Sequence, residues 1–155
     1  MTQSTTIFTT SFQSPFEAKP TLLGVLSGDE VMTQFKAVEW LKIRQQILTT
    51  QEDDIKKYFY YFETKYTDDQ KAQNTLSIFG EYPQREYYDE KTPLIFSIRL
   101  FRPKAQNITS IQKALRTTEM EKCSLVFAEK CLEAFINNDN DFLDNQVIGN
   151  VKSDK

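Results

Sequence analysis

Ten consecutive residues, KYFYYFETKY at 57–66, carry six aromatic rings, and this stretch constrains the fold most strongly. Read as a strand, it places Tyr60 and Phe62 on one face and Phe59 and Tyr61 on the other, because strand side chains alternate. Read as a helix, it gathers rings on one stripe, and periodicity alone leaves both interpretations open. We favour the strand, since Tyr, Phe and Thr suit a pleated surface and lose rotamer freedom in helices.

The clearest strand in the sequence is PLIFSIRLFRP, residues 93–103, which has a proline at each end. A solvated face of an antiparallel sheet is normally polar. Both predicted strands instead carry apolar side chains on two faces, so something has to cover the second face: a helix, the N-terminal segment, a second copy or a different subunit. In this strand the two faces are Leu94, Phe96, Ile98 and Leu100 against Ile95, Ser97, Arg99 and Phe101.

Two capping boxes predict where helices begin. Ser27 followed by Glu30 predicts a helix from residue 28, and the segment 38–48 either continues that helix or forms a strand. The run Thr118-Glu119-Met120-Glu121 predicts a second helix that continues to about residue 137. The buried stripe of this second helix is expected to be Leu125, Ala128, Leu132, Phe135 and Ile136.

These elements predict an α+β fold in two layers, with an antiparallel sheet of about four strands packed against an N-terminal and a C-terminal helix. The other two strands are expected near 7–12, as an edge strand, and at 76–82. A length of 155 residues suits one domain. We expect residues 1–20 to be an N-terminal tail or edge strand, 21–137 a single α+β domain, and 138–155 a flexible C-terminal tail.

The composition argues against catalysis. The chain has no histidine, and therefore no imidazole base and no histidine-containing metal site or catalytic triad. None of the four glycines has the spacing of a phosphate-binding loop. Cys123 and Cys131 cannot complete a four-ligand zinc site alone, and the oxygen-rich segment 139–144 lacks the glycine and glutamate of an EF-hand loop. We expect no enzymatic activity, no cofactor and no metal.

Charge and hydropathy bear on location. The net charge is −3, and acids and bases are mixed along the whole chain, so no basic surface for nucleic acid is predicted. The N-terminus lacks the pattern of a secretory signal, and no apolar run reaches the length of a membrane span. We expect a soluble, cytoplasmic protein that does not bind membranes.

The expected function is therefore binding of another macromolecule, as a subunit, adaptor, chaperone-like protein or inhibitor, with a protein partner or a second copy of the chain. Two alternatives are a single-stranded nucleic-acid binder that stacks bases on exposed rings, and a carrier of a small apolar ligand. Tyr, Phe and Arg are the residue types enriched at protein interfaces. The predicted contact surface is a sheet face with Tyr61, Tyr87, Tyr88, Arg99 and Phe101.

Overall fold

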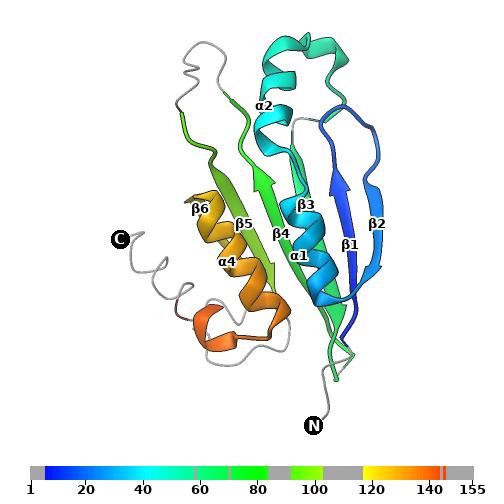
Figure 1. Ribbon diagram of the computed structural model, residues 1–155, viewed down its shortest axis with the longest axis vertical. Helices are drawn as coiled ribbons and strands as arrows, with labels where there is room; N and C mark the ends of the chain where they lie inside the picture. The colour runs from blue at the N-terminus through cyan, green and yellow to red at the C-terminus, as the bar shows by residue number, and fades with distance from the viewer. Residues whose placement is uncertain are drawn as a thin grey trace.

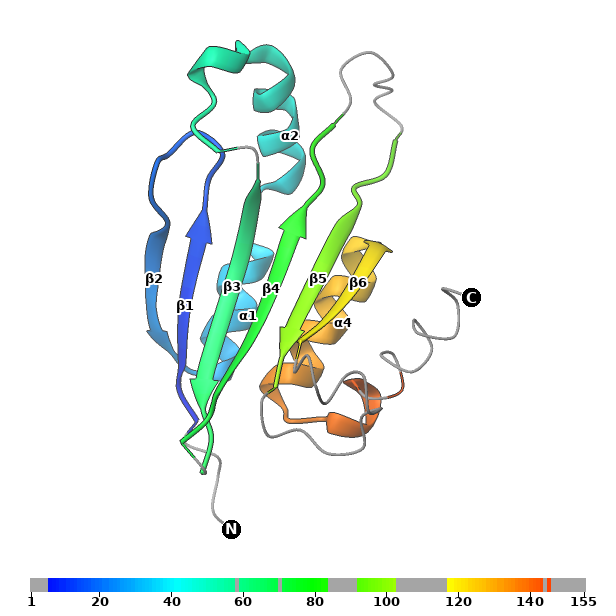
Figure 2. The same cartoon turned by 180° about the vertical axis from the view of Figure 1, so that it is seen from behind.

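The computed structural model of the chain describes residues 6–57, 59–69, 71–83, 92–102, 117–143 and 145. In these residues a six-stranded antiparallel sheet has its helices on one face (Figure 1). Seen from behind, the opposite face of the sheet lies in front of all of these helices (Figure 2). The α+β prediction is confirmed, with six strands instead of about four.

The strand order is β2-β1-β3-β4-β5-β6, so β1 and β2 form a hairpin at one edge and β3 to β6 follow one another across the sheet. The segment expected to be a tail or edge strand thus contains an inner strand, since β1 lies between β2 and β3. In chain order the elements are β1 Phe8–Gln13, β2 Thr21–Leu26, α1 Gly28–Lys36, α2 Trp40–Thr49, η1 Glu52–Asp54, β3 Tyr60–Thr67, β4 Gln73–Gly80, β5 Phe96–Phe101, β6 Thr117–Cys123 and α4 Leu125–Ile136.

The aromatic stretch forms β3, so the strand interpretation is confirmed. Its even-numbered side chains enter the core, where Tyr60 is 1% and Phe62 0% exposed. Tyr60 lies opposite Gly80 on β4, and its ring occupies the space that a side chain at Gly80 would need. Tyr61 lies on the other face of the sheet. The sequence therefore divides its rings between the two faces, and only one set is used in the core.

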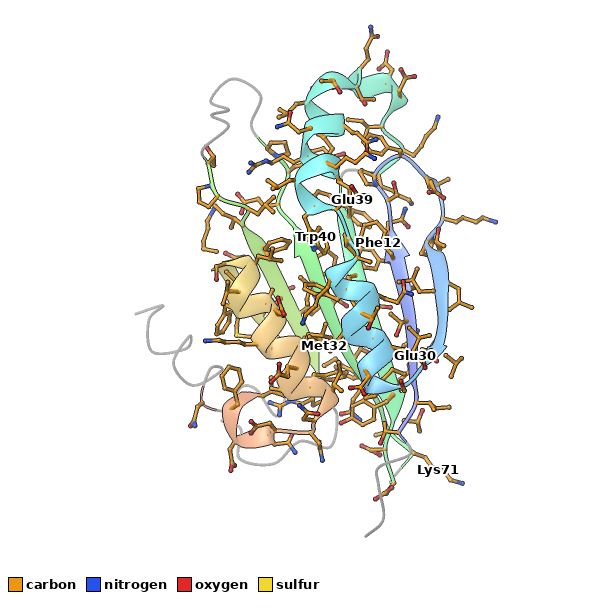
Figure 3. All side chains as sticks on the ribbon, viewed as in Figure 1. Phe12, Glu30, Met32, Glu39, Trp40 and Lys71 are labelled. Atoms are coloured by element: carbon orange, nitrogen blue, oxygen red, sulfur yellow. The ribbon has the colours of Figure 1, made fainter. Side chains whose placement is uncertain are left out.

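Aromatic side chains of the helices pack against those of the sheet and fill the core. Trp40, the first residue of α2, lies beside Phe12 of β1 between the helices and the sheet, with ring centroids 5.8 Å apart (Figure 3). The Trp40 ring also lies 5.0 Å from that of Phe96 and 5.9 Å from those of Phe35 and Tyr60. These contacts join α1, α2 and three strands into one core.

The first capping box is confirmed. The Ser27 hydroxyl accepts a hydrogen bond from the Glu30 amide at 3.3 Å, and the Glu30 carboxylate accepts one from the Ser27 amide at 3.0 Å. The segment 38–48 neither continues this helix nor forms a strand, because the chain turns after Lys36 and starts the separate helix α2 at Trp40.

The second predicted helix start is wrong. Residues 117–123 form β6, in which Met120 pairs with Ile98 and is 1% exposed. Helix α4 begins only at Leu125, where the Ser124 hydroxyl accepts a hydrogen bond from the Phe127 amide at 3.1 Å. Pairing with β5 buries Met120 completely, a long-range gain that outweighs the local capping pattern. The buried side chains of α4 are Ala128, Cys131, Leu132, Ala134 and Phe135.

Both cysteines are buried and free, Cys123 in β6 and Cys131 in α4. The expected C-terminal tail begins with packed residues, since Leu143 is 1% exposed and Asn140 accepts a hydrogen bond from buried Arg102 at 3.3 Å. No helix in the described ranges is both long and apolar enough to cross a bilayer.

Candidate functional site

The sheet face opposite the helices, named the open face below, is the candidate site. No helix within the described ranges lies over it (Figure 2). Its side chains fall into rows that run across the strands, because paired residues of antiparallel strands point to the same side. The three central strands contribute Tyr61, Glu63 and Lys65 from β3, Thr75, Ser77 and Phe79 from β4, and Ser97, Arg99 and Phe101 from β5.

One row is aromatic. Tyr61 of β3 pairs with Phe79 of β4, and their ring centroids lie 5.0 Å apart. Phe59, just before β3, stacks on Tyr61 at 5.8 Å with 22° between the ring planes, and it is 44% exposed. Partial burial raises the pKa of the Tyr61 phenol, and the neighbouring Glu63 carboxylate raises it further. The hydroxyl therefore stays neutral and available as a hydrogen-bond donor at physiological pH.

The next row carries charges. Glu63, Ser77, Arg99 and Glu119 follow one another across β3, β4, β5 and β6. The Ser77 hydroxyl donates to Glu63 at 2.9 Å, while Nε and Nη2 of Arg99 each lie 2.7 Å from Oε1 of Glu119. The Arg99 guanidinium also lies over the Phe79 ring, 5.3 Å from its centroid. Arg99 is thus fixed from two sides, although its side chain is 54% exposed.

Two shallow hollows flank Phe79 and Arg99, which line both of them and form the ridge between them. The larger, of about 550 Å³, extends over β3, β4 and β5, and the smaller, of about 240 Å³, lies toward β6. Both are open to solvent, so they suit side chains presented by a partner better than an enclosed small molecule. The larger is lined by Phe59, Tyr61, Glu63, Thr75, Ser77, Phe79, Arg99 and Phe101, and the smaller by Phe79, Ser97, Ile98, Arg99, Glu119 and Glu121.

The apolar character of the open face continues to the β2 edge. Leu22 pairs with Ser11 and Val25 with Thr9, which places both apolar side chains on the open face. Leu22 is 64% and Val25 59% exposed. Isolated exposed apolar residues are ordinary on protein surfaces. Here they lie on the same face as the aromatic row, separated from it by the polar side chains of β1 and β3.

The structure brings together three of the five predicted contact residues, because Tyr61, Arg99 and Phe101 all line the larger hollow. Tyr87 and Tyr88 lie outside the described residues. Sequence reasoning missed Phe79, which joins the aromatic row to Arg99. The alternation of side chains in the predicted strand 76–82 could have identified Phe79, since it places this residue on the same face as Ser77.

The arrangement of the described residues bears on metal binding and on thiol reactivity. Within the described ranges, no three His, Cys, Asp or Glu side chains gather closely enough to hold a metal ion. Burial raises the pKa of the Cys131 thiol to about 12, and the nearby Cys123 contributes to this shift. A thiol with such a pKa is protonated and unreactive at neutral pH.

No family model matches the chain, and no curated protein or solved structure shows significant similarity to it.

Proposed function

We propose that this protein works without catalysis, by binding another protein through the open face. The single observation that carries this proposal is the aromatic row of Phe59, Tyr61 and Phe79 on a sheet face that no described helix covers. A subunit, adaptor, chaperone-like protein or inhibitor would each use such a surface.

The free energy available at this surface is considerable. A half-exposed aromatic side chain still offers roughly 100 Å² of apolar surface, which is worth about 2–3 kcal/mol when a partner buries it. Leu22 and Val25 add exposed aliphatic surface on the same face. Because antiparallel sheets normally present polar side chains to water, a face of this composition is best explained by a partner that removes it from solvent.

The charged row supports specificity. A partner that docks here meets the carboxylates of Glu63 and Glu119 and the guanidinium of Arg99, whose order across the strands fixes its orientation. Arg99 is held by Glu119 and Phe79 before any partner arrives, so little side-chain entropy is lost on binding. These features favour one defined docking geometry over nonspecific hydrophobic association.

The same face is less suited to single-stranded nucleic acid. Stacking rings are present, but Glu63, Glu119 and Glu121 line the hollows beside them and would repel phosphates. A carrier of a small apolar ligand finds less support, because the space between the two layers is filled by Trp40 and its neighbours.

The test is a quantitative pull-down with the intact chain from a lysate of its own source. The wild type is compared with Arg99→Glu/Phe101→Ala on the open face and with Leu41→Ala/Lys42→Glu on α2, where both side chains are exposed. We expect the open-face pair to lose specific partners that the α2 pair retains. Identical partner sets for all three chains would overturn the proposal. A labelled oligonucleotide titrated at two salt concentrations tests the nucleic-acid alternative, which requires salt-sensitive binding.

A further inference from the structure

We infer that the open face binds a second copy of this chain, so that two copies pack sheet to sheet about a two-fold axis parallel to β4. This inference depends on the proposed use of the open face for protein binding and specifies the partner. Two-fold dimers are the commonest protein assembly, and they require a surface that is complementary to itself. The rows of the open face have this property.

The complementarity comes from the charged row. Glu63 on β3 and Arg99 on β5 lie in one row on either side of Ser77 on β4. A two-fold axis along β4 exchanges the β3 side of one copy with the β5 side of the other. Each Glu63 then faces the Arg99 of the other copy, which gives two ion pairs related by symmetry.

The alternative axis, perpendicular to the strands, is unfavourable. Placed through the charged row, it would set Glu63 against Glu63 and Arg99 against Arg99. Stacked sheets also prefer to keep their strands within about 30° of each other. Glu63 and Arg99 lie only one strand, about 4.8 Å, from the axis. A crossing angle of about 30° between the two sheets would therefore displace each Glu63–Arg99 pair by roughly 2.5 Å, which an arginine side chain can span.

The shape of the open face fits the same axis. The larger hollow is lined from β3, β4 and β5, with Glu63 at its β3 side and Arg99 at its β5 side. The symmetry operation brings Arg99 of each copy to the Glu63 side of the other copy's hollow. Phe79 of β4 lies near the axis, where its ring can contact its symmetry mate.

Glu63 provides independent support. Its carboxylate accepts a hydrogen bond from Ser77 but forms no ion pair with any residue of the described segments. Covering the face would remove this half-buried carboxylate from water, which is unfavourable unless a cation accompanies it. Arg99 of a second copy supplies that cation, and Arg99 keeps its bond to Glu119 because the guanidinium has donors for both carboxylates.

The size of the face sets the expected affinity. Six strands about 4.8 Å apart and six to eight residues long cover roughly 500–650 Å², or about 1,000–1,300 Å² for two copies. This lies at the lower end of the range for specific interfaces. We therefore expect a reversible dimer with a dissociation constant in the micromolar range.

Charge reversal tests the pairing by sedimentation velocity from roughly 1 to 200 µM, a range that brackets a micromolar constant. Arg99→Glu and Glu63→Arg, each alone, should raise the dissociation constant at least about tenfold by opposing like charges. An equimolar mixture of these two variants should form a heterodimer close to wild-type affinity, since both ion pairs are restored, one with its native polarity and one with exchanged polarity. The double variant Glu63→Arg/Arg99→Glu should dimerise for the same reason. Lys42→Glu and Glu133→Arg, on the helical layer, are the matched controls and should behave as wild type.

A loss of folding has to be distinguished from a loss of dimerisation, because Arg99→Glu also places its new carboxylate beside that of Glu119. Thermal melts identify a variant that fails to fold. Thr75→Arg, which leaves that ion pair intact, opposes two arginines near the axis and should also give monomers. Dimers in Thr75→Arg, or monomers in the mixture of folded single variants, would overturn the inference.

The two proposals fail in different ways. If the wild type stays monomeric at every concentration, the inference about a second copy is overturned. The proposed function still holds in that case if Arg99→Glu/Phe101→Ala loses specific partners in the pull-down. A dimer that none of the open-face variants weakens places the contact elsewhere and overturns the inference.

Discussion

The guanidinium of Arg99 lies 5.3 Å from the ring centroid of Phe79 on the neighbouring strand, and its Nε and Nη2 both bond to one oxygen of Glu119. A planar cation held over a ring and against a carboxylate has few remaining rotamers. The open face therefore presents an ordered arginine ridge between two hollows, and this order is what distinguishes it from a merely apolar surface.

Replacing Phe79 with Thr should separate binding from folding. The ring is half-buried on the open face, so its loss should change the free energy of unfolding by no more than about 1.5 kcal/mol. Self-association should weaken at least about tenfold, because the ring lies near the proposed axis. Leu41→Thr removes an exposed apolar side chain from α2 and serves as the control. Unchanged association of Phe79→Thr in sedimentation would contradict this prediction.

Gly80→Ala should destabilise the fold by about 2–3 kcal/mol, because a methyl group there would overlap the buried Tyr60 ring. Without this clash, replacing glycine by alanine raises stability by about 0.4–1 kcal/mol through the unfolded chain. The sign of the change is therefore diagnostic in urea unfolding. Ser97→Ala on β5 controls for strand propensity. Stabilisation of Gly80→Ala would show that the ring does not occupy this space.

Ser124→Ala should lower the free energy of unfolding by about 1 kcal/mol, since it removes the hydroxyl that caps α4 at the Phe127 amide. Ser124→Asp keeps an acceptor at the cap and should remain close to wild type. Chemical denaturation of the three chains measures both differences. Equal stability of Ser124→Ala and wild type would place the start of α4 elsewhere.

Alkaline pH should destabilise the protein through Tyr60. Burial raises the pKa of this phenol to about 12 from an ordinary value near 10. A raised folded-state pKa contributes stability that is complete below pH 10 and is lost as the pH rises from 10 toward 12. Urea unfolding between pH 8 and 11 should show this decline, and Tyr60→Phe should reduce its slope, with Tyr82→Phe as a comparison. The same slope in Tyr60→Phe and wild type would contradict the assignment.

The alternation of side chains made much of this fold predictable. Residues 57–66 and 93–103 each showed two faces of different composition, and these segments contain most of β3 and all of β5, whose outer faces carry Tyr61, Arg99 and Phe101. The same reasoning predicted the open face, because rings on both sides of a strand cannot all be in one core.

Local patterns failed where long-range pairing decides the structure. Residues 117–123 include a capping-box pattern typical of a helix start, yet they pair with β5 and form the edge strand β6. No strand was predicted for the apolar run 21–26, which forms the edge strand β2 by pairing with β1, with Gly24 at φ 138° near an irregularity in the register. Because neither segment was predicted as a strand, the predicted strand count was too low.

The most direct test of the open face is a photo-crosslink from its centre. A benzoylphenylalanine replacing Thr75 projects into the larger hollow, and the same group replacing Lys42 projects from α2 as a control. On irradiation in native extract and with purified protein, we expect position 75 to give discrete protein adducts, including one at twice the chain mass, and position 42 to give none. Uncrosslinked chain at both positions, under conditions in which free benzoylphenylalanine reacts, would contradict the claim that a protein covers this face.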